Sequence, residues 1–162
     1  IQGAVLVDKD KITKPGTFID IQSEITVLFT TNPYVSRGGI KLEHALGYFE
    51  ISPMNKICLD IGASTGGFTD CLLKRGAKKV YAIDVGYGQF DYGLRKDPRV
   101  VLLERTNVRY LMPEKLYKPD EKKATVCCVD LSFISLSKVF SPLIDLVEPS
   151  EGTHLLTLFK PQ

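Results

Sequence analysis

A glycine-rich segment between a strand pattern and a helix pattern constrains the fold of this chain most. The segment reads Asp60-Ile-Gly-Ala-Ser-Thr-Gly-Gly-Phe-Thr-Asp70 and follows the apolar residues 57–59. Phe68, Leu72 and Leu73 give the residues after the turn the spacing of a helix. A strand, a glycine turn and a helix in this order place backbone N–H groups beside a nucleotide-type ligand. The segment therefore predicts the ligand-binding turn of an α/β domain.

A carboxylate after the next apolar run supports a ligand site at this turn. Asp84 ends the run 80–83, where a carboxylate can accept hydrogen bonds from both hydroxyls of a ribose. The order Gly62-x-x-x-Gly66-Gly67 lacks the second glycine of a G-x-G-x-x-G dinucleotide pattern, and no Arg or Lys lies inside the loop to meet a phosphate. We therefore predict S-adenosylmethionine, which carries a ribose and an amino-acid tail. A plain βα turn with glycines kept for packing remains the alternative.

Strand and helix patterns alternate along the rest of the chain. The run Ala124-Thr-Val-Cys-Cys-Val129 is apolar on both faces, which is typical of a parallel sheet covered by helices on both sides. In such sheets, ligands bind beyond the carboxyl ends of the strands. We predict strands at 57–61, 79–84, 100–103, 124–130 and 153–159, helices from Gly39 onward, at 66–75, within 86–96 and at 136–147, and an irregular stretch up to about residue 120.

Composition narrows the class of protein. With 162 residues, 44% of them hydrophobic, the chain can bury one sizeable core. The net charge of +2 does not by itself indicate nucleic-acid binding, and basic groups such as 74–75 and 78–79 fit either solvated helix ends or a substrate-facing surface. Four cysteines without C-x-x-C spacing indicate reduced packing residues of a cytoplasmic protein and no metal site. No apolar run approaches membrane-spanning length, so we expect no stable membrane association.

Residues 1–30 differ from the remainder. Short strand patterns at 4–7, 11–13 and 24–28 are separated by turn residues, and three strands of this length bury too little surface to be stable alone. They predict the end of a small domain whose beginning lies outside this chain. Residues 30–33, Thr-Thr-Asn-Pro, indicate a linker.

Three charged residues stand where they could meet at one crevice. Asp130 directly follows one apolar strand pattern, and Lys160 follows another. Lys41 lies near the start of the first predicted helix. Each has an ordinary explanation alone, since charges mark strand ends and most helical lysines are solvated. The prediction of a site rests on their convergence.

Several of these segments together resemble the TlyA proteins, a family often named haemolysin and related to the FtsJ/RrmJ ribose methyltransferases. The matches run in order from Ser36 to the last residue. They are Ser36-Arg-Gly-Gly-x-Lys-Leu, the segment 60–70, Ala82-Ile-Asp-Val-Gly-Tyr-Gly-Gln89, Glu104-Arg-Thr-Asn107, Asp130-x-Ser-Phe-Ile-Ser135 and Lys160-Pro-Gln162. The stretch from Gly3 to Gly16 is similar to the end of an S4 RNA-binding domain.

The resemblance implies a Rossmann-like, doubly wound methyltransferase fold with a mostly parallel sheet. It implies S-adenosylmethionine-dependent 2′-O-methylation of cytidines in ribosomal RNA, and a Lys–Asp–Lys–Glu tetrad in which Lys41, Asp130 and Lys160 match the first three members. We expect Lys160 to act as general base, and Arg37 and Lys41 to contact RNA. The residues expected to contact the cofactor are Asp60, Gly62, Ala63, Ser64, Thr65, Gly66, Gly67, Phe68, Asp84, Asn107 and Asp130.

The resemblance also predicts the domain boundaries. We expect residues 1–30 to be the β part of an S4-like domain, 31–36 a linker and 37–162 an FtsJ-like methyltransferase domain that lacks its last strands. The tetrad glutamate would lie beyond Gln162. The chain is therefore expected to be a piece of a longer protein, inactive as it stands.

Three other functions stay open at this point. A haemolysin needs an amphipathic or membrane-spanning segment, and the sequence shows neither. A nicotinamide-dependent oxidoreductase is disfavoured by the glycine spacing. A non-catalytic RNA-binding module would not need Lys41, Asp130 and Lys160. The sequence leaves the oligomeric state and the modified nucleotide open.

Overall fold

The structure is a computed structural model that describes residues 5–14, 16–28, 32–132 and 135–160. The chain divides into two compact units, Ile1–Asn32 and Pro33–Gln162. Ala4 lies outside the described residues, as do Thr30 and Thr31 of the expected linker, Phe133, Ile134 and the last two residues.

The first unit contains a three-stranded antiparallel sheet. Its strands are β1 (Val5–Val7), β2 (Asp10–Ile12) and β3 (Ile25–Val27), in the order β2-β1-β3. Asp8 and Lys9 form the two-residue turn between β1 and β2, and both have positive φ, as tight hairpins require. The three expected strands are confirmed; β2 lies one residue earlier than predicted, and β3 is shorter than predicted.

The second unit is built on a parallel sheet of five strands. They are β4 (Ile57–Ile61), β5 (Lys79–Ile83), β6 (Val100–Leu103), β7 (Val126–Val129) and β8 (His154–Thr157), in the order β6-β5-β4-β7-β8. The chain thus starts in the middle, proceeds to one edge and returns to the other side of β4. This doubly wound order confirms the expected fold class and leaves a crevice where the direction reverses, between β4 and β7.

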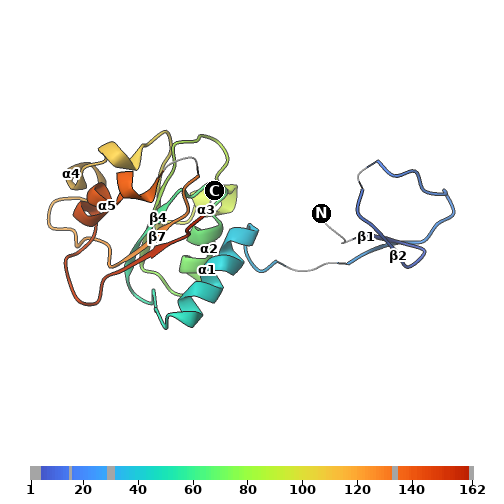
Figure 1. The fold of residues 1–162 in the computed structure, drawn as a ribbon, viewed down its shortest axis with the longest axis horizontal. Coiled ribbons are helices and arrows are strands. Elements are labelled where there is room, and N and C mark those ends of the chain that lie inside the picture. The colour runs from blue at the N-terminus through green and yellow to red at the C-terminus, as the bar shows by residue number, and fades with distance from the viewer. Residues whose placement is uncertain (1–4, 15, 29–31, 133–134, 161–162) are drawn as a thin grey trace. The chain divides into compact units, whose positions relative to one another are not determined.

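Helices cover both faces of this sheet (Figure 1). On one face lie α1 (Arg37–Tyr48), α2 (Gly67–Lys74) and α3 (Tyr92–Arg95), whose apolar side chains share a core with Cys58 and Cys128. On the other face lie η1 (Val108–Tyr110), α4 (Pro113–Leu116), η2 (Leu136–Lys138) and α5 (Phe140–Leu146), packed with Leu59 and Cys127. Adjacent residues of one strand therefore point into different cores, which explains why the strands are apolar throughout.

Two sequence predictions about helices were wrong. The expected helix 136–147 is two pieces, η2 and α5, because Pro142 has no N–H to donate within a continuous helix but fits the first turn of a new one. The expected irregular stretch contains η1 and α4, which begin after the cap residue Asn107 and at Pro113.

Candidate functional site

The carboxyl ends of three central strands bring the predicted polar residues to one edge. Ile61 of β4 is in register with Ile83 of β5 and with Val129 of β7. The residues that follow these positions, Gly62, Asp84 and Asp130, therefore leave the sheet side by side. Asp84 and Asp130 therefore lie at the edge of the sheet where a ligand was expected.

Gly62 is required by a close approach between two of these strand ends. Its φ is +86°, in the left-handed region that favours glycine. A Cβ at this position would overlap the backbone carbonyl oxygen of Asp130. Gly67 plays a similar role between helices, because a Cβ there would overlap Ser36 Oγ at the start of α1. The glycines thus let backbone segments meet at the site.

Four N–H groups of the glycine loop already donate within the protein. Gly62 and Ala63 donate to the carbonyl oxygen of Ile83, at 2.9 and 3.2 Å. Ser64 donates to Asp84 Oδ2 at 2.7 Å, and Gly66 donates to the carbonyl oxygen of Ala63 at 2.7 Å. The expectation that the loop offers free N–H groups is therefore wrong for these four, because they hold the loop in its own conformation.

Asp84 is fixed by two backbone donors. In addition to the bond from Ser64, its Oδ1 accepts a hydrogen bond from the Gly86 N–H at 2.6 Å. A carboxylate offers about four acceptor positions, so each oxygen can still accept a hydroxyl. The side chain is thus oriented in advance for the predicted ribose contact.

A hollow of about 570 Å³ lies beyond these strand ends. We call it the inner hollow. Apolar and polar side chains line it in about equal numbers, so it suits a ligand that has both apolar and hydrogen-bonding groups. Its polar side chains are those of Ser64, Asp84, Gln89, Thr106, Asn107, Asp130 and Ser132. Asn107 caps η1 by accepting the Arg109 N–H at 3.1 Å through Oδ1.

A second hollow of about 480 Å³, the outer hollow, adjoins the first. Its lining includes Arg37 and Lys41 from α1, together with Thr65, Gly67 and Phe68. Gly62, Ser64 and Asp130 line both hollows. Asp130 therefore stands at the boundary between a pocket with a ribose-type acceptor and a pocket with two cations.

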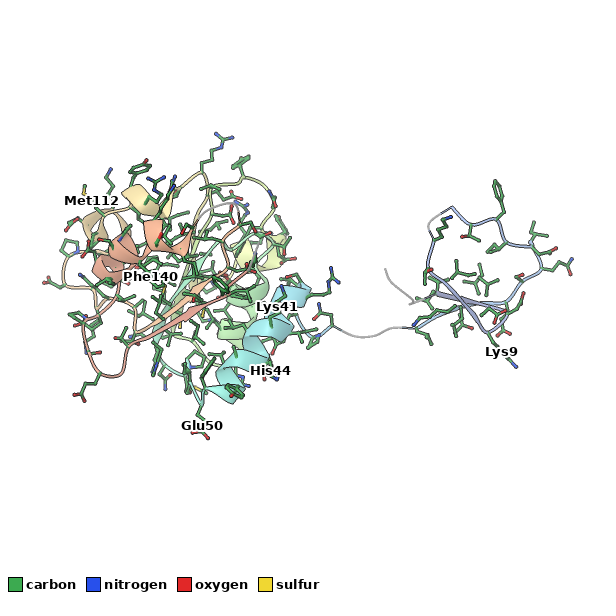
Figure 2. All side chains as sticks on the ribbon, in the orientation of Figure 1. Lys9, Lys41, His44, Glu50, Met112 and Phe140 are labelled. Carbon is green, nitrogen blue, oxygen red and sulfur yellow. The ribbon has the colours of Figure 1, made fainter. Side chains whose placement is uncertain are left out.

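Lys160 joins this boundary from β8. Its Nζ forms an ion pair with Asp130 Oδ1 and donates a hydrogen bond to Ser132 Oγ at 3.0 Å. The Lys160 side chain is 41% exposed and that of Asp130 is 22% exposed, so the pair faces the solvent side of the site. Lys41 projects from α1 (Figure 2). Lys160 thus contacts Asp130, and Asp130 lines the outer hollow together with Lys41.

Asp60 lies deeper than the sequence argument placed it. It is the fourth residue of β4, it is completely buried, and it lines neither hollow. Its Oδ2 accepts hydrogen bonds from Thr69 N–H at 2.8 Å and Thr69 Oγ1 at 2.6 Å, while no group of the described residues bonds to Oδ1. Burial, with smaller contributions from the charges of Asp84 and Asp130, raises the pKa of Asp60 to about 7 despite the opposing bonds from Thr69.

The sequence analysis missed the set of bonds that holds α1 against α2. Glu43 Oε2 accepts hydrogen bonds from Tyr34 Oη at 2.7 Å and Arg75 Nε at 2.9 Å. These bonds lower the pKa of Glu43 to about 2, the contribution of Arg75 being the largest. Asp70 Oδ2 accepts the Val35 N–H at 2.9 Å. No local pattern signals these bonds, since up to 35 residues separate their partners.

The remaining basic residues do not form one substrate-facing surface. Lys74, Arg75, Arg95 and Arg99 form ion pairs with Asp70, Glu43, Glu104 and Asp97. Lys78, Lys79 and Arg99 line a hollow at the amino ends of the strands, away from the predicted site. The interpretation as ordinary surface charges therefore fits these groups.

Other classes of site are not visible in the described part of the chain. All four cysteines are buried and unpaired, as expected of packing residues. No group of three or more His, Cys, Asp or Glu residues there could hold a metal ion. None of the helices described is long and apolar enough to cross a membrane.

Comparisons with known proteins agree on one family. The model of the FtsJ-like methyltransferase family matches residues 34–162. The chain is 48% identical over 160 residues to a Bacillus subtilis protein named as a candidate rRNA methyltransferase, YqxC, covering 99% of this chain and 55% of that protein. It is 45% identical over 161 residues to the 16S/23S rRNA (cytidine-2′-O)-methyltransferase TlyA of Mycobacterium tuberculosis, covering 99% and 58%.

A solved structure supports the fold. The protein, from Streptococcus thermophilus and described as a hemolysin candidate, matches 90% of this chain and 53% of its own with a TM-score of 0.73 and 42% identity. The chain spans a little over half the length of the relatives that it matches.

Proposed function

The chain belongs to the FtsJ-like methyltransferase family, and on that premise we propose that it is the catalytic part of an rRNA 2′-O-methyltransferase. The donor is S-adenosylmethionine and the acceptor is the ribose 2′-hydroxyl of a cytidine in ribosomal RNA, as the name of the mycobacterial relative suggests. A ribosomal substrate also places the enzyme in the cytoplasm. The observation that carries the proposal is the pair of adjoining hollows that share Asp130.

The inner hollow fits the donor. Asp84 is held with spare acceptor capacity for ribose hydroxyls, and the apolar wall that includes Val85 and Val108 suits an adenine. Gly62 and Ser64 would line the methionine end, near Asp130. Asp60 stands behind this end as a buried carboxyl, and it acts on the donor through the field of its charge rather than by contact. When bound, the donor supplies a methyl group on a sulfonium, which is a good leaving group.

The outer hollow fits the acceptor nucleotide. Arg37 and Lys41 offer positive charge to the phosphates beside the target ribose. A 2′-hydroxyl is a poor nucleophile, so its proton must be taken as it attacks. We assign that proton to Lys160 Nζ, which must first release a proton of its own, because only an amine can act as a base. Asp130 orients Lys160 through the contact between its Oδ1 and Nζ, and Lys41 stabilises the negative charge that develops on the oxygen.

Cofactor binding tests the proposal directly. Titration of the chain with S-adenosylmethionine and, separately, with NAD is expected to show binding of the first only. Asp84→Ala should weaken binding at least tenfold, because the ribose loses its acceptor. Asp91→Ala is the control, since Asp91 caps α3 and lies outside both hollows. Binding of NAD alone would instead support an oxidoreductase.

Methyl transfer tests the role of Lys160. In the full-length protein, Lys160→Ala is expected to lower the turnover number on ribosomal RNA by about 10²–10⁴-fold, the usual contribution of a general base. Lys138→Ala, a matched lysine in η2, should leave turnover unchanged. Turnover of Lys160→Ala within twofold of the unsubstituted protein would remove Lys160 from the mechanism.

A further inference from the structure

Two exposed tyrosines, each within two residues of a residue that lines the inner hollow, carry an arginine over the ring. The Arg105 guanidinium carbon lies 4.2 Å from the ring centroid of Tyr87, and that of Arg109 lies 5.4 Å from the ring centroid of Tyr110. The two tyrosine side chains are 65% and 70% exposed. Each pair therefore offers an aromatic face and a positive charge to the solvent.

Tyr87 and Arg105 lie in loops next to the wall of the inner hollow, and Arg109 and Tyr110 lie in η1, which begins with the lining residue Val108. Tyr87 stands between Val85 and Gln89, and both of these residues line that hollow. Arg105 and Arg109 flank the lining residues 106–108 on either side. The pairs therefore lie at the end of the hollow assigned to the adenosine, away from the boundary at Asp130. Neither tyrosine itself lines the hollow.

The loop that carries Tyr87 is held in place without a ligand. Its Gly86 carbonyl oxygen accepts the Arg105 N–H at 3.0 Å, and its Gly88 N–H donates to Glu104 Oε1 at 2.7 Å. Glu104 is in turn fixed by Arg95 at 2.8 Å. The exposed ring is thus preorganised, so a partner that stacks on it does not have to order the loop first.

The charge on these pairs is available to an anion. Arg105 and Arg109 form no ion pair with a carboxylate among the residues that the structure describes. A guanidinium lying on a tyrosine ring offers a flat surface and a positive charge together. Proteins that bind single-stranded nucleic acid use this combination, because bases stack on the rings and cations meet the phosphates.

We propose that Tyr87–Arg105 and Tyr110–Arg109 form a stacking surface for unpaired nucleotides that flank the target nucleotide of the RNA substrate. The inference rests on the proposed function and deepens it, because it names the form of RNA that the site accepts. The target ribose enters the outer hollow, while neighbouring bases stack on the rim of the inner one. The enzyme therefore prefers a loop or an opened helix to an intact duplex.

Tyrosine variants of the full-length protein test the surface. Tyr87→Leu and Tyr110→Leu are each expected to weaken binding of a single-stranded octaribonucleotide about tenfold, measured by fluorescence anisotropy. Tyr87→Phe and Tyr110→Phe should restore binding, because the ring and not the hydroxyl is needed. Tyr48→Leu is the matched control: this tyrosine is 75% exposed but lies on α1, stacked on His44, and lines neither hollow.

Three further measurements separate stacking from other causes. The variants should raise the KM for deproteinised ribosomal RNA and leave kcat and donor affinity unchanged. Arg105→Gln should reduce the slope of log affinity against log salt concentration by about 0.7, whereas the tyrosine variants should not change it. The unsubstituted protein should bind the octaribonucleotide more tightly than the same sequence in a duplex.

The outcomes distinguish this inference from the proposed function. If Tyr87→Leu and Tyr110→Leu bound the single strand as tightly as the Tyr48→Leu control does, the stacking surface would be overturned. A tenfold loss of donor affinity in the same variants would also overturn it, by assigning the rings to the donor site. Ring-dependent RNA binding in a protein that transfers no methyl group would keep the surface and reject the methyltransferase.

Discussion

At Asp60 a carboxyl group lies in the interior of the sheet with no cation beside it. Its Oδ1 has no partner among the described residues, and Asp84 and Asp130 add like charge nearby. The ionised form is therefore disfavoured in the folded chain, and the pKa of Asp60 is raised to about 7 from its usual 3.8. A positively charged ligand bound nearby would stabilise the ionised form of such a carboxyl. The buried carboxylate would in turn favour binding of that ligand.

The raised pKa of Asp60 predicts a loss of stability as pH rises. Below about pH 4 the carboxyl is protonated in both states; between 4 and 7 the unfolded chain ionises while the folded chain does not, so folding becomes less favourable. A shift of about three pKa units corresponds to about 4 kcal/mol at pH 8. Asp60→Asn should therefore be more stable than the unsubstituted chain at pH 8 and not at pH 4, in urea unfolding of the ligand-free protein.

An exposed carboxyl provides the control for Asp60. Asp145→Asn, on the exposed side of α5, is the matched exchange of Asp for Asn outside the core. The free energy of unfolding of Asp60→Asn could differ from that of the unsubstituted chain by the same amount at pH 4 and pH 8. The substitution would then act through packing, and the ionisation argument would be wrong.

Glycine substitutions test the close approach at the strand ends. Gly62→Ala should destabilise the chain by about 2 kcal/mol or more. An alanine is strained at the left-handed φ of this position, and its Cβ would overlap the carbonyl oxygen of Asp130. Gly47→Ala should do the opposite and stabilise by about 0.5–1 kcal/mol, since it lies in α1 with open space around it. Equal effects of the two substitutions on the urea midpoint would contradict the geometry.

At the scale of elements, the sequence predicted those parts whose signal is local. The strands that carry the site, β4, β5 and β7, are short apolar runs closed by a charged residue or glycine, and all three were found. The prediction of a continuous helix at 136–147 was wrong, because Pro142 cannot donate a hydrogen bond within such a helix although the apolar spacing fits one. The four N–H groups used inside the glycine loop could not be foreseen, because their acceptors, apart from Ala63, lie on β5 or just after it.

The contact between α1 and α2 was equally invisible in the sequence, and it predicts a measurable coupling. Glu43→Gln and Arg75→Gln should each destabilise the chain, with a coupling energy of about 1 kcal/mol in a double-mutant cycle, because both side chains are more than one-third exposed. The coupling should shrink in 1 M salt. Additive effects of the two substitutions would show that the pair adds nothing to the packing of the helices.

At the scale of the whole molecule, the division into two units separates two proposed tasks. Residues that line the two hollows all lie between 36 and 139, within the second unit. The first unit contributes a small antiparallel sheet whose assignment to an S4-like RNA-binding domain stays a prediction. If both assignments are right, damage to the first sheet should affect RNA binding and leave the donor site intact.

Leu6→Pro in the full-length protein tests this separation. Leu6 is in the central strand of the first sheet, where proline removes ladder hydrogen bonds, so the sheet should be lost. Affinity for ribosomal RNA should fall at least tenfold and become less dependent on salt, because phosphate contacts disappear. The dissociation constant for S-adenosylmethionine, measured by calorimetry, should stay within twofold. Leu6→Val keeps the strand and should change neither quantity, whereas a large loss of donor affinity in Leu6→Pro would show that the second unit depends on the first.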